Sequence, residues 1–151
     1  MSKMGKAMKY FVLPGAIVLG LGGAFKAATA EGPRDPMGPC PNTPNCVSSL
    51  TTDTDKKVAP FDFNGNPKDA KNKLVNIIAN MERTKIIVNK GGYLHAEFKT
   101  AIGFTDDIEF QFDLNASKID VRSASRFGYS DFGANRKRVE LIRQKFEGNT
   151  P

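Results

Sequence analysis

The chain has 151 residues, which is enough for one domain with a buried core. Its formal net charge is +6, but four of its 22 basic residues (Lys3, Lys6, Lys9 and Lys26) lie in the first thirty positions, which contain no acidic residue. Removing these four leaves 18 basic against 16 acidic residues. This near balance argues against a function in which bulk positive charge binds nucleic acid.

Residues 1–30 have the pattern of an export signal. Three lysines precede the uncharged apolar run Tyr10–Phe25, and the small residues Ala28 and Ala30 flank Thr29. This pattern predicts a signal peptide that is cleaved after Ala30, and therefore export to a periplasm, a lumen or the medium. The alternative is a membrane anchor over residues 10–25, although these sixteen residues are fewer than the ~20 that a spanning helix needs.

Both cysteines lie in the segment CPNTPNC, Cys40–Cys46, which follows a linker of residues 31–39 that is rich in Gly and Pro. In an exported chain, a close pair of this kind predicts a disulfide. A metal site is disfavoured, because two cysteines and the single histidine of the chain are too few ligands for a tetrahedral site. We predict no cofactor.

The globular domain is expected over residues 40–147, with a short tail over 148–151. Asn66 and Pro67 predict the start of a helix, as its N-cap and its first residue. The helix is expected to end near Glu82 or Arg83. Apolar residues at helical spacing would form its buried stripe: Ala70, Leu74, Ile77, Ile78 and Met81.

Four strands are predicted next, over Lys85–Asn89, Tyr93–Lys99, Asp106–Phe112 and Lys118–Ala124. In the last three, apolar and polar residues alternate with period two, as expected of an antiparallel sheet with one buried face. A two-residue turn at Asn115–Ala116 sets a register for the last two strands. In this register the paired residues match chemically: Phe110 with Val121, Phe112 with Ile119, Glu109 with Arg122, and Asp113 with Lys118.

A second helix is predicted from near Asn135, with Val139, Ile142 and Phe146 as its buried stripe. The predicted order is helix, four strands, helix. This order indicates an α+β two-layer domain, in which an antiparallel sheet of about four strands has both helices packed on one face.

Four segments occur in an order and spacing that we recognise: CPNTPNCVSS (Cys40–Ser49), YLHAEF (Tyr93–Phe98), GFTDDIEF (Gly103–Phe110) and VRSASRFGYSDFGANRKRVE (Val121–Glu140). Together they closely resemble DUF1499, an uncharacterised domain of unknown function, over about Cys40–Phe146. The resemblance implies an exported or membrane-associated protein. It implies no activity and no catalytic residue, because none is assigned in that family.

The segment Val121–Glu140 holds a candidate site for a small anion, made of Arg122, Arg126, Arg136 and Arg138. Two of these arginines fall in the first turn of the second helix, where the helix dipole disfavours positive charge. Guanidinium and free helix N–H groups there would bind a carboxylate, phosphate or sulfated group. The competing hypothesis, which we favour, is internal pairing. Arg122 has Glu109 opposite, Asp131 can cap or pair nearby, and Asp106 and Asp107 are acids without an assigned partner. The other three arginines have no obvious partner.

A second candidate site lies on the polar side of the predicted sheet and consists of His95, Glu97, Asp107 and Glu109. A connection centred on Gly103 would place Glu97 opposite Glu109, and two carboxylates beside a histidine can do acid–base work or hold a hard cation. The alternative, which we favour, is the ordinary solvated side of an antiparallel sheet. The sequence has no G-x-S-x-G elbow, P-loop or H-E-x-x-H motif.

These patterns predict a non-enzymatic exported domain that binds a small anion or a protein partner, and no nucleic acid. Two alternatives remain open. One is an accessory subunit of a membrane complex, tethered by an uncleaved helix over residues 10–25. The other is a hydrolase that uses His95 with Glu97 and Glu109.

Overall fold

A computed structural model describes residues 37–148 of the chain, which form an α+β domain. The predicted signal peptide or anchor over 1–30, most of the linker over 31–39 and the tail after 148 lie outside the described residues. Within the described part, no helix is long and apolar enough to cross a membrane. The elements in chain order are β1 (Cys46–Ser48), β2 (Phe61–Asp62), α1 (Pro67–Ala79), β3 (Thr84–Lys90), β4 (Tyr93–Lys99), β5 (Thr105–Asp113), β6 (Lys118–Ser125) and α2 (Ala134–Glu147).

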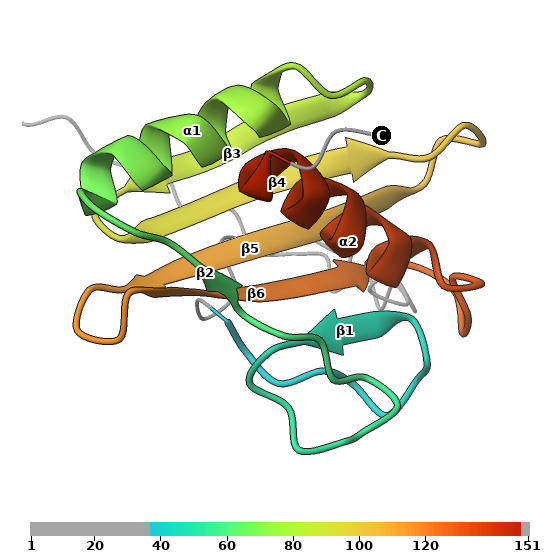
Figure 1. Ribbon diagram of the computed structural model, residues 1–151. Coiled ribbons are helices and arrows are strands. Elements are labelled where there is room, and N and C mark those ends of the chain that lie inside the picture. The colour runs from blue at the N-terminus through green and yellow to red at the C-terminus, as the bar shows by residue number, and fades with distance from the viewer. Residues whose placement is uncertain (1–36, 149–151) are drawn as a thin grey trace, which may run out of the picture. The chain divides into compact units, whose positions relative to one another are not determined.

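The sheet is antiparallel, with the strand order β1-β6-β5-β4-β3, and β2 also pairs with β6 (Figure 1). The structure therefore has six strands, and the prediction of about four is inexact. The two additional strands, β1 and β2, have only three and two residues. Neither is long enough to show the period-two alternation that identifies a strand in a sequence.

The predicted register of β5 and β6 is confirmed. Glu109 lies opposite Arg122, and Phe110 lies opposite Val121. The hairpin register follows from local information, because the turn that joins the two strands is short and each face pairs like with like or charge with countercharge.

The predicted register of β4 and β5 is wrong by two residues, because Glu97 lies opposite Asp107 rather than Glu109. The connection between the strands is a loop over residues 100–104, whose centre is Ile102 rather than Gly103. Moving the centre of a hairpin by one residue moves every cross-strand partner by two. A five-residue loop without a distinctive turn signature does not define its own centre from sequence.

Both helices begin as the sequence predicts. The Asn66 side chain accepts a hydrogen bond from the backbone N–H of Lys68, and Pro67 is the first residue of α1. Helix α1 ends at Ala79, a few residues before the predicted end. Helix α2 starts one residue before Asn135, and its predicted stripe is buried.

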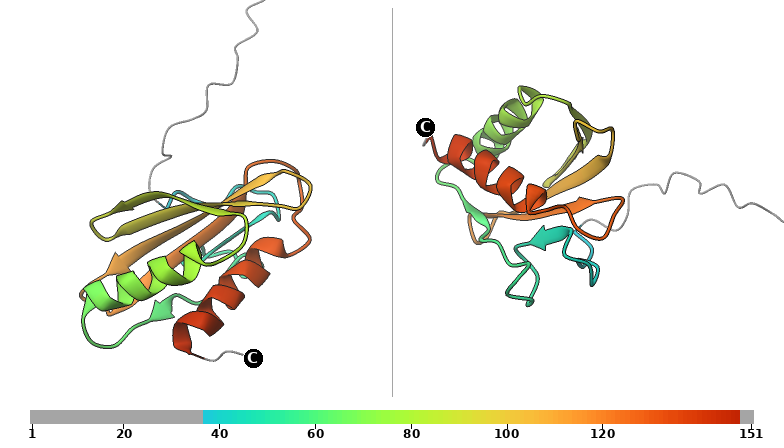
Figure 2. Two further views of the ribbon diagram at one scale, coloured as in Figure 1. Left: turned by 90° about the horizontal axis from the view of Figure 1, so that it is seen from above. Right: turned by 90° about the vertical axis from the view of Figure 1, so that its right-hand side faces the viewer.

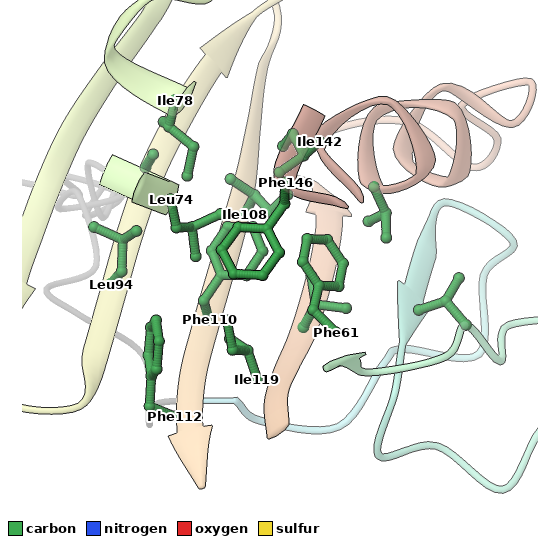
Figure 3. Close-up of a cluster of buried hydrophobic side chains, with 14 of the residues drawn as sticks. Phe61, Leu74, Ile78, Leu94, Ile108, Phe110, Phe112, Ile119, Ile142 and Phe146 are labelled. Atoms are coloured by element: carbon green, nitrogen blue, oxygen red, sulfur yellow. The ribbon is translucent and has the colours of Figure 1, made fainter. Parts of the chain in front are cut away.

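Helices α1 and α2 lie in front of the same face of the sheet (Figures 1 and 2). Their buried side chains join those of β4, β5 and β6 in one hydrophobic core (Figure 3). At its centre the ring of Phe61, from the short strand β2, meets Phe110 and Phe146, with centroid separations of 5.7 and 5.8 Å. The core takes alternate residues of the long strands, so the residues between them project from the opposite face of the sheet.

Candidate functional site

The face of the sheet opposite the helices carries a network of ionisable side chains, which we call the charged sheet face. It brings together all four residues predicted for the polar side of the sheet. Tyr93 and Arg122 lie beside them on the same face, and Arg126 reaches in from the loop after β6. The members are Tyr93, His95, Glu97, Asp107, Glu109, Arg122 and Arg126.

Glu109 is the buried centre of one half of this face. Arg122 Nη1 donates to Glu109 Oε2 at 2.7 Å, and the two side chains are only 8% and 6% exposed. The predicted pairing of these two residues is thus confirmed. The Tyr93 hydroxyl donates to Glu109 Oε1 at 2.6 Å. Burial, together with this bond to a carboxylate, raises the pKa of Tyr93 well above its ordinary value.

Asp107 is the centre of the other half. His95 Nε2 lies 2.7 Å from Asp107 Oδ1, and Arg126 donates through Nε and Nη2 to both oxygens of the same carboxylate. Arg126 also pairs with Glu97. Burial alone would raise the pKa of Asp107, but the bonds from His95 and Arg126 outweigh it and hold that pKa well below its ordinary value. The bond to Asp107 in turn raises the pKa of Arg126.

The carboxylates of this face are bonded to side chains of the domain itself, and the arrangement does not present them to a substrate. The 2.7 Å contact between His95 and Asp107 has the geometry of an oriented general base. A serine nucleophile would have to lie on the same face of the sheet as this base. Ser123 and Ser125 instead project from the opposite face of β6, where both bond to the side chain of Asn135. Among residues 37–148, no group of His, Cys, Asp and Glu is arranged to hold a metal ion. The geometry therefore favours a structural network.

On the helix side of the sheet, a second polar network surrounds Asn135, the second residue of α2. This side chain is fully buried and every one of its polar atoms is bonded, so we call the network the Asn135 hub. Its Nδ2 donates to the side chains of Ser125 and Asp131 and to the Asn45 carbonyl, while its Oδ1 accepts from Ser123 and Arg138.

The remaining arginines also have partners inside the domain. Arg138 pairs with Asp106 of β5, which is almost completely buried, and its guanidinium lies over the Phe98 ring at 4.9 Å. Arg136 donates to the backbone carbonyls of Asp55 and Lys57 at 2.7 and 2.8 Å. Arg126, Arg136 and Arg138, which have no obvious partner in the sequence, are therefore all bound within the domain, as the favoured hypothesis of internal pairing expects. Their partners lie on other elements, where no local sequence pattern places them.

The four arginines of the predicted anion site do not meet at one place. Arg122 and Arg126 lie on the charged sheet face, Arg138 lies on the helix side, and Arg136 contacts the loop after β1. Because the sheet separates these groups, one small anion cannot contact all four. The geometry favours internal pairing.

Large apolar side chains that the sequence patterns did not single out are exposed on two loops. The two loops lie at the same end of the sheet (Figures 1 and 2). One loop joins β4 to β5 and the other, residues 126–133, joins β6 to α2. The rings of Phe104 and Phe127 stack between the loops, with centroids 5.4 Å apart. We call this surface the aromatic loop end; its members are Ile102, Phe104, Phe127, Tyr129 and Phe132, which are 78%, 44%, 71%, 72% and 91% exposed.

A signal for this surface is present in the sequence: three aromatic residues within FGYSDF, a loop segment with neither helical nor strand periodicity. The backbone of this loop is held by polar contacts. The Asn45 side chain donates to the Gly128 carbonyl at 2.6 Å, and Asp131 accepts from the backbone of Gly133. The predicted disulfide is confirmed and closes the segment Cys40–Cys46 that carries Asn45.

A family model described as a protein of unknown function (DUF1499) matches residues 37–146. The chain belongs to this family. The match confirms the resemblance to DUF1499 and covers every element from β1 to nearly the end of α2. In this DUF1499 domain, the segment VRSASRFGYSDFGANRKRVE supplies all the side chains of the Asn135 hub and three of the five members of the aromatic loop end. No curated protein matches the chain.

Proposed function

We propose that this DUF1499 domain is a non-enzymatic binding domain that works outside the cytoplasm and contacts a protein partner through the aromatic loop end. The observation that carries the proposal is the exposure of five large apolar side chains on two adjoining loops. Two of them, Phe104 and Phe127, stack against each other across the loops. Exposed apolar side chains that gather in this way mark interaction surfaces.

The composition of the loop favours a protein as the partner. Residues 126–133, RFGYSDFG, combine Phe, Tyr and Arg with Gly and Ser, the residue types that are enriched in protein-binding loops. The hydrogen bonds from Asn45 and Asp131 hold the loop backbone before any partner arrives. Less conformational entropy is then lost on binding.

The disulfide supports the proposed location. Disulfides persist in oxidising compartments and are rare in the cytosol. The Cys40–Cys46 bond is therefore consistent with export. An uncleaved helix over residues 10–25 would leave the domain in the same compartment, and would present the same loops to other subunits of a membrane complex. A cleaved, exported domain and a tethered subunit would thus differ in tethering and not in the binding surface.

The binding surface is tested by placing the photo-crosslinking residue benzoyl-phenylalanine at Phe132 in the native host. The control position is Leu114, which is 61% exposed in the β5–β6 turn, at the other end of the sheet. Irradiation is expected to give a protein adduct of discrete mass from position 132, and none from position 114. Equal adducts at both positions, or no adduct at 132, would contradict the proposal.

A lipid surface is the competing occupant, and fluorescence separates it from a protein. The chain contains no tryptophan, so the variant Phe132→Trp carries a single indole reporter. With vesicles of phosphatidylcholine and phosphatidylglycerol, we expect its emission to remain that of an exposed indole. A blue shift that depends on vesicle concentration would identify a membrane as the partner and overturn the protein assignment.

A further inference from the structure

A groove of about 460 Å³ lies between the C-terminal end of α1 and helix α2, over the end of β4. Its apolar lining includes Phe98 from β4, Met81 from the segment after α1, and Leu141 from α2. Leu141 is 40% exposed, although it is a large apolar side chain. The groove is separate from the charged sheet face, which lies on the other side of the sheet.

The basic residues of the groove lie on one face of α2. Lys137, Leu141 and Lys145 are four residues apart, so they follow one another along the same side of the helix. The two lysines stand about 12 Å apart along the helix axis. Neither has an ion-pair partner among residues 37–148. Arg138 also lines the groove, but its guanidinium is already bound to Asp106 and the Asn135 hub.

The groove has little negative charge. Glu82 is the one acidic residue in the lining that the structure describes; its carboxylate lies 3.8 Å from the neighbouring Arg83, and its side chain is 87% exposed. The groove thus offers an apolar surface with two unpaired cations at its rim. This combination complements a molecule that has an aliphatic body and a negatively charged end.

We propose that this groove binds a small aliphatic carboxylate. The aliphatic chain lies against Phe98, Met81 and Leu141, and the carboxylate binds Lys137 or Lys145. The volume is within the range of about 300–1,000 Å³ that small-molecule sites occupy. A protein is not proposed as the ligand of this groove, because a protein interface would need about 800 Å² of surface from each partner. The flexible thioether of Met81 suits chains of differing shape. The proposal does not depend on the aromatic loop end.

The test uses dodecanoate, below its critical micelle concentration, and the full chain as purified from its host. Titration calorimetry is expected to show saturable binding, and amide chemical-shift changes should centre on Met81, Phe98 and Leu141. Shorter chains should bind more weakly, by about fourfold for each methylene that no longer enters the groove. Dodecanol, which has no charge, should bind about fivefold more weakly than dodecanoate.

Variants locate the site. Lys137→Glu and Lys145→Glu together should weaken dodecanoate binding by about twentyfold or more, and Leu141→Asp by at least about tenfold. Lys68→Glu, at the exposed start of α1, is the matched control and should bind as the wild type does. Unchanged circular dichroism and melting temperature would show that the variants are folded.

Three results would overturn the proposal: no saturable binding of dodecanoate, equal affinity for dodecanol, or wild-type affinity in the double lysine variant. None of them bears on crosslinking from position 132, so this inference and the proposed function fail separately.

Discussion

Asp107 illustrates how a polar side chain on an outer sheet face becomes part of the fold. Its carboxylate is bonded to His95 and to Nε and Nη2 of Arg126, and its side chain is only 15% exposed. Because these partners favour the ionised form, the pKa of Asp107 is lower in the folded chain than in the unfolded chain. A pKa of that kind links stability to pH.

The sign of this linkage gives a prediction for Asp107→Asn. A lowered folded-state pKa contributes stability that is present above the unfolded value of about 4, and that is lost as the pH falls through the folded value. At pH 7 the substitution should lower the free energy of unfolding by about 1–3 kcal/mol. The difference from wild type should shrink as the pH is lowered from 5 to 3, measured by urea denaturation at each pH.

The control for this prediction is Asp62→Asn, the same substitution in an exposed ion pair. Asp62 lies 3.4 Å from Lys118, and its side chain is 80% exposed. Asp62→Asn should change the free energy of unfolding by less than about 0.5 kcal/mol at each of these pH values. If Asp107→Asn also gave a difference that did not vary with pH, the bonds from His95 and Arg126 would not govern its ionisation.

At the scale of elements, the start of α2 is held by an unusual set of contacts. The N-cap position is Gly133, in the left-handed conformation with φ of 79°, and it offers no side-chain cap. Asp131 supplies the missing acceptor, since its carboxylate bonds the backbone N–H groups of Gly133 and Asn135. Arg136 and Arg138 tolerate the helix dipole because each is bound to oxygen acceptors on other elements.

The Asn135 hub should therefore be a major source of stability for this end of the domain. Asn135→Ala removes the hydrogen bonds of Asn135 to the Asn45 carbonyl and to the Ser123 and Ser125 hydroxyls, and it opens a small cavity at a fully buried position. We expect the free energy of unfolding to fall by about 2–4 kcal/mol, measured by urea denaturation. Hydrogen exchange should accelerate first in residues 126–138.

Asn115→Ala, in the exposed β5–β6 turn, is the matched control. Among residues 37–148 the Asn115 side chain makes no hydrogen bond, and only its backbone N–H is held, by Asp113. Its effect should remain below about 0.5 kcal/mol. If Asn135→Ala lowered the free energy of unfolding by as little as Asn115→Ala, the hub would be dispensable for stability.

At the scale of the whole described domain, features of different chemistry gather at one end of the sheet. Strands β4 and β6 both finish there, and the loops that follow them carry the aromatic side chains. The groove opens over the end of β4, and Asn45 of the disulfide-closed segment contacts the loop after β6. The β3–β4 and β5–β6 connections, at the other end, are short turns. Binding is therefore expected at the end with the longer loops.

The location of the whole chain is predicted by residues 1–30, which lie outside the described residues. We expect the mature protein from its native host to begin at Glu31, because the small residues before it match a signal-peptidase site. Intact-mass spectrometry measures this directly. A mass that includes Met1 would contradict cleavage and would favour a subunit tethered through residues 10–25.

Several parts of this protein follow from the sequence because they depend on local patterns. The N-cap at Asn66, the buried stripe of α2 and the Arg122–Glu109 pair are each determined by residues close together along the chain or across one short hairpin. The Cys40–Cys46 disulfide has the same origin, since the two cysteines are six positions apart and have no competitor.

The tertiary structure decided what depends on distant contacts. The short strands β1 and β2 exist because β6 supplies their hydrogen bonds. The partner of Arg138 is Asp106, 32 residues away across the interface of helix and sheet. Exposure is also a tertiary property: Phe110 and Phe132 are the same residue type, but one is completely buried and the other is 91% exposed. The packing of the layers determines what covers a side chain. Local periodicity therefore cannot predict the burial of a side chain in a loop.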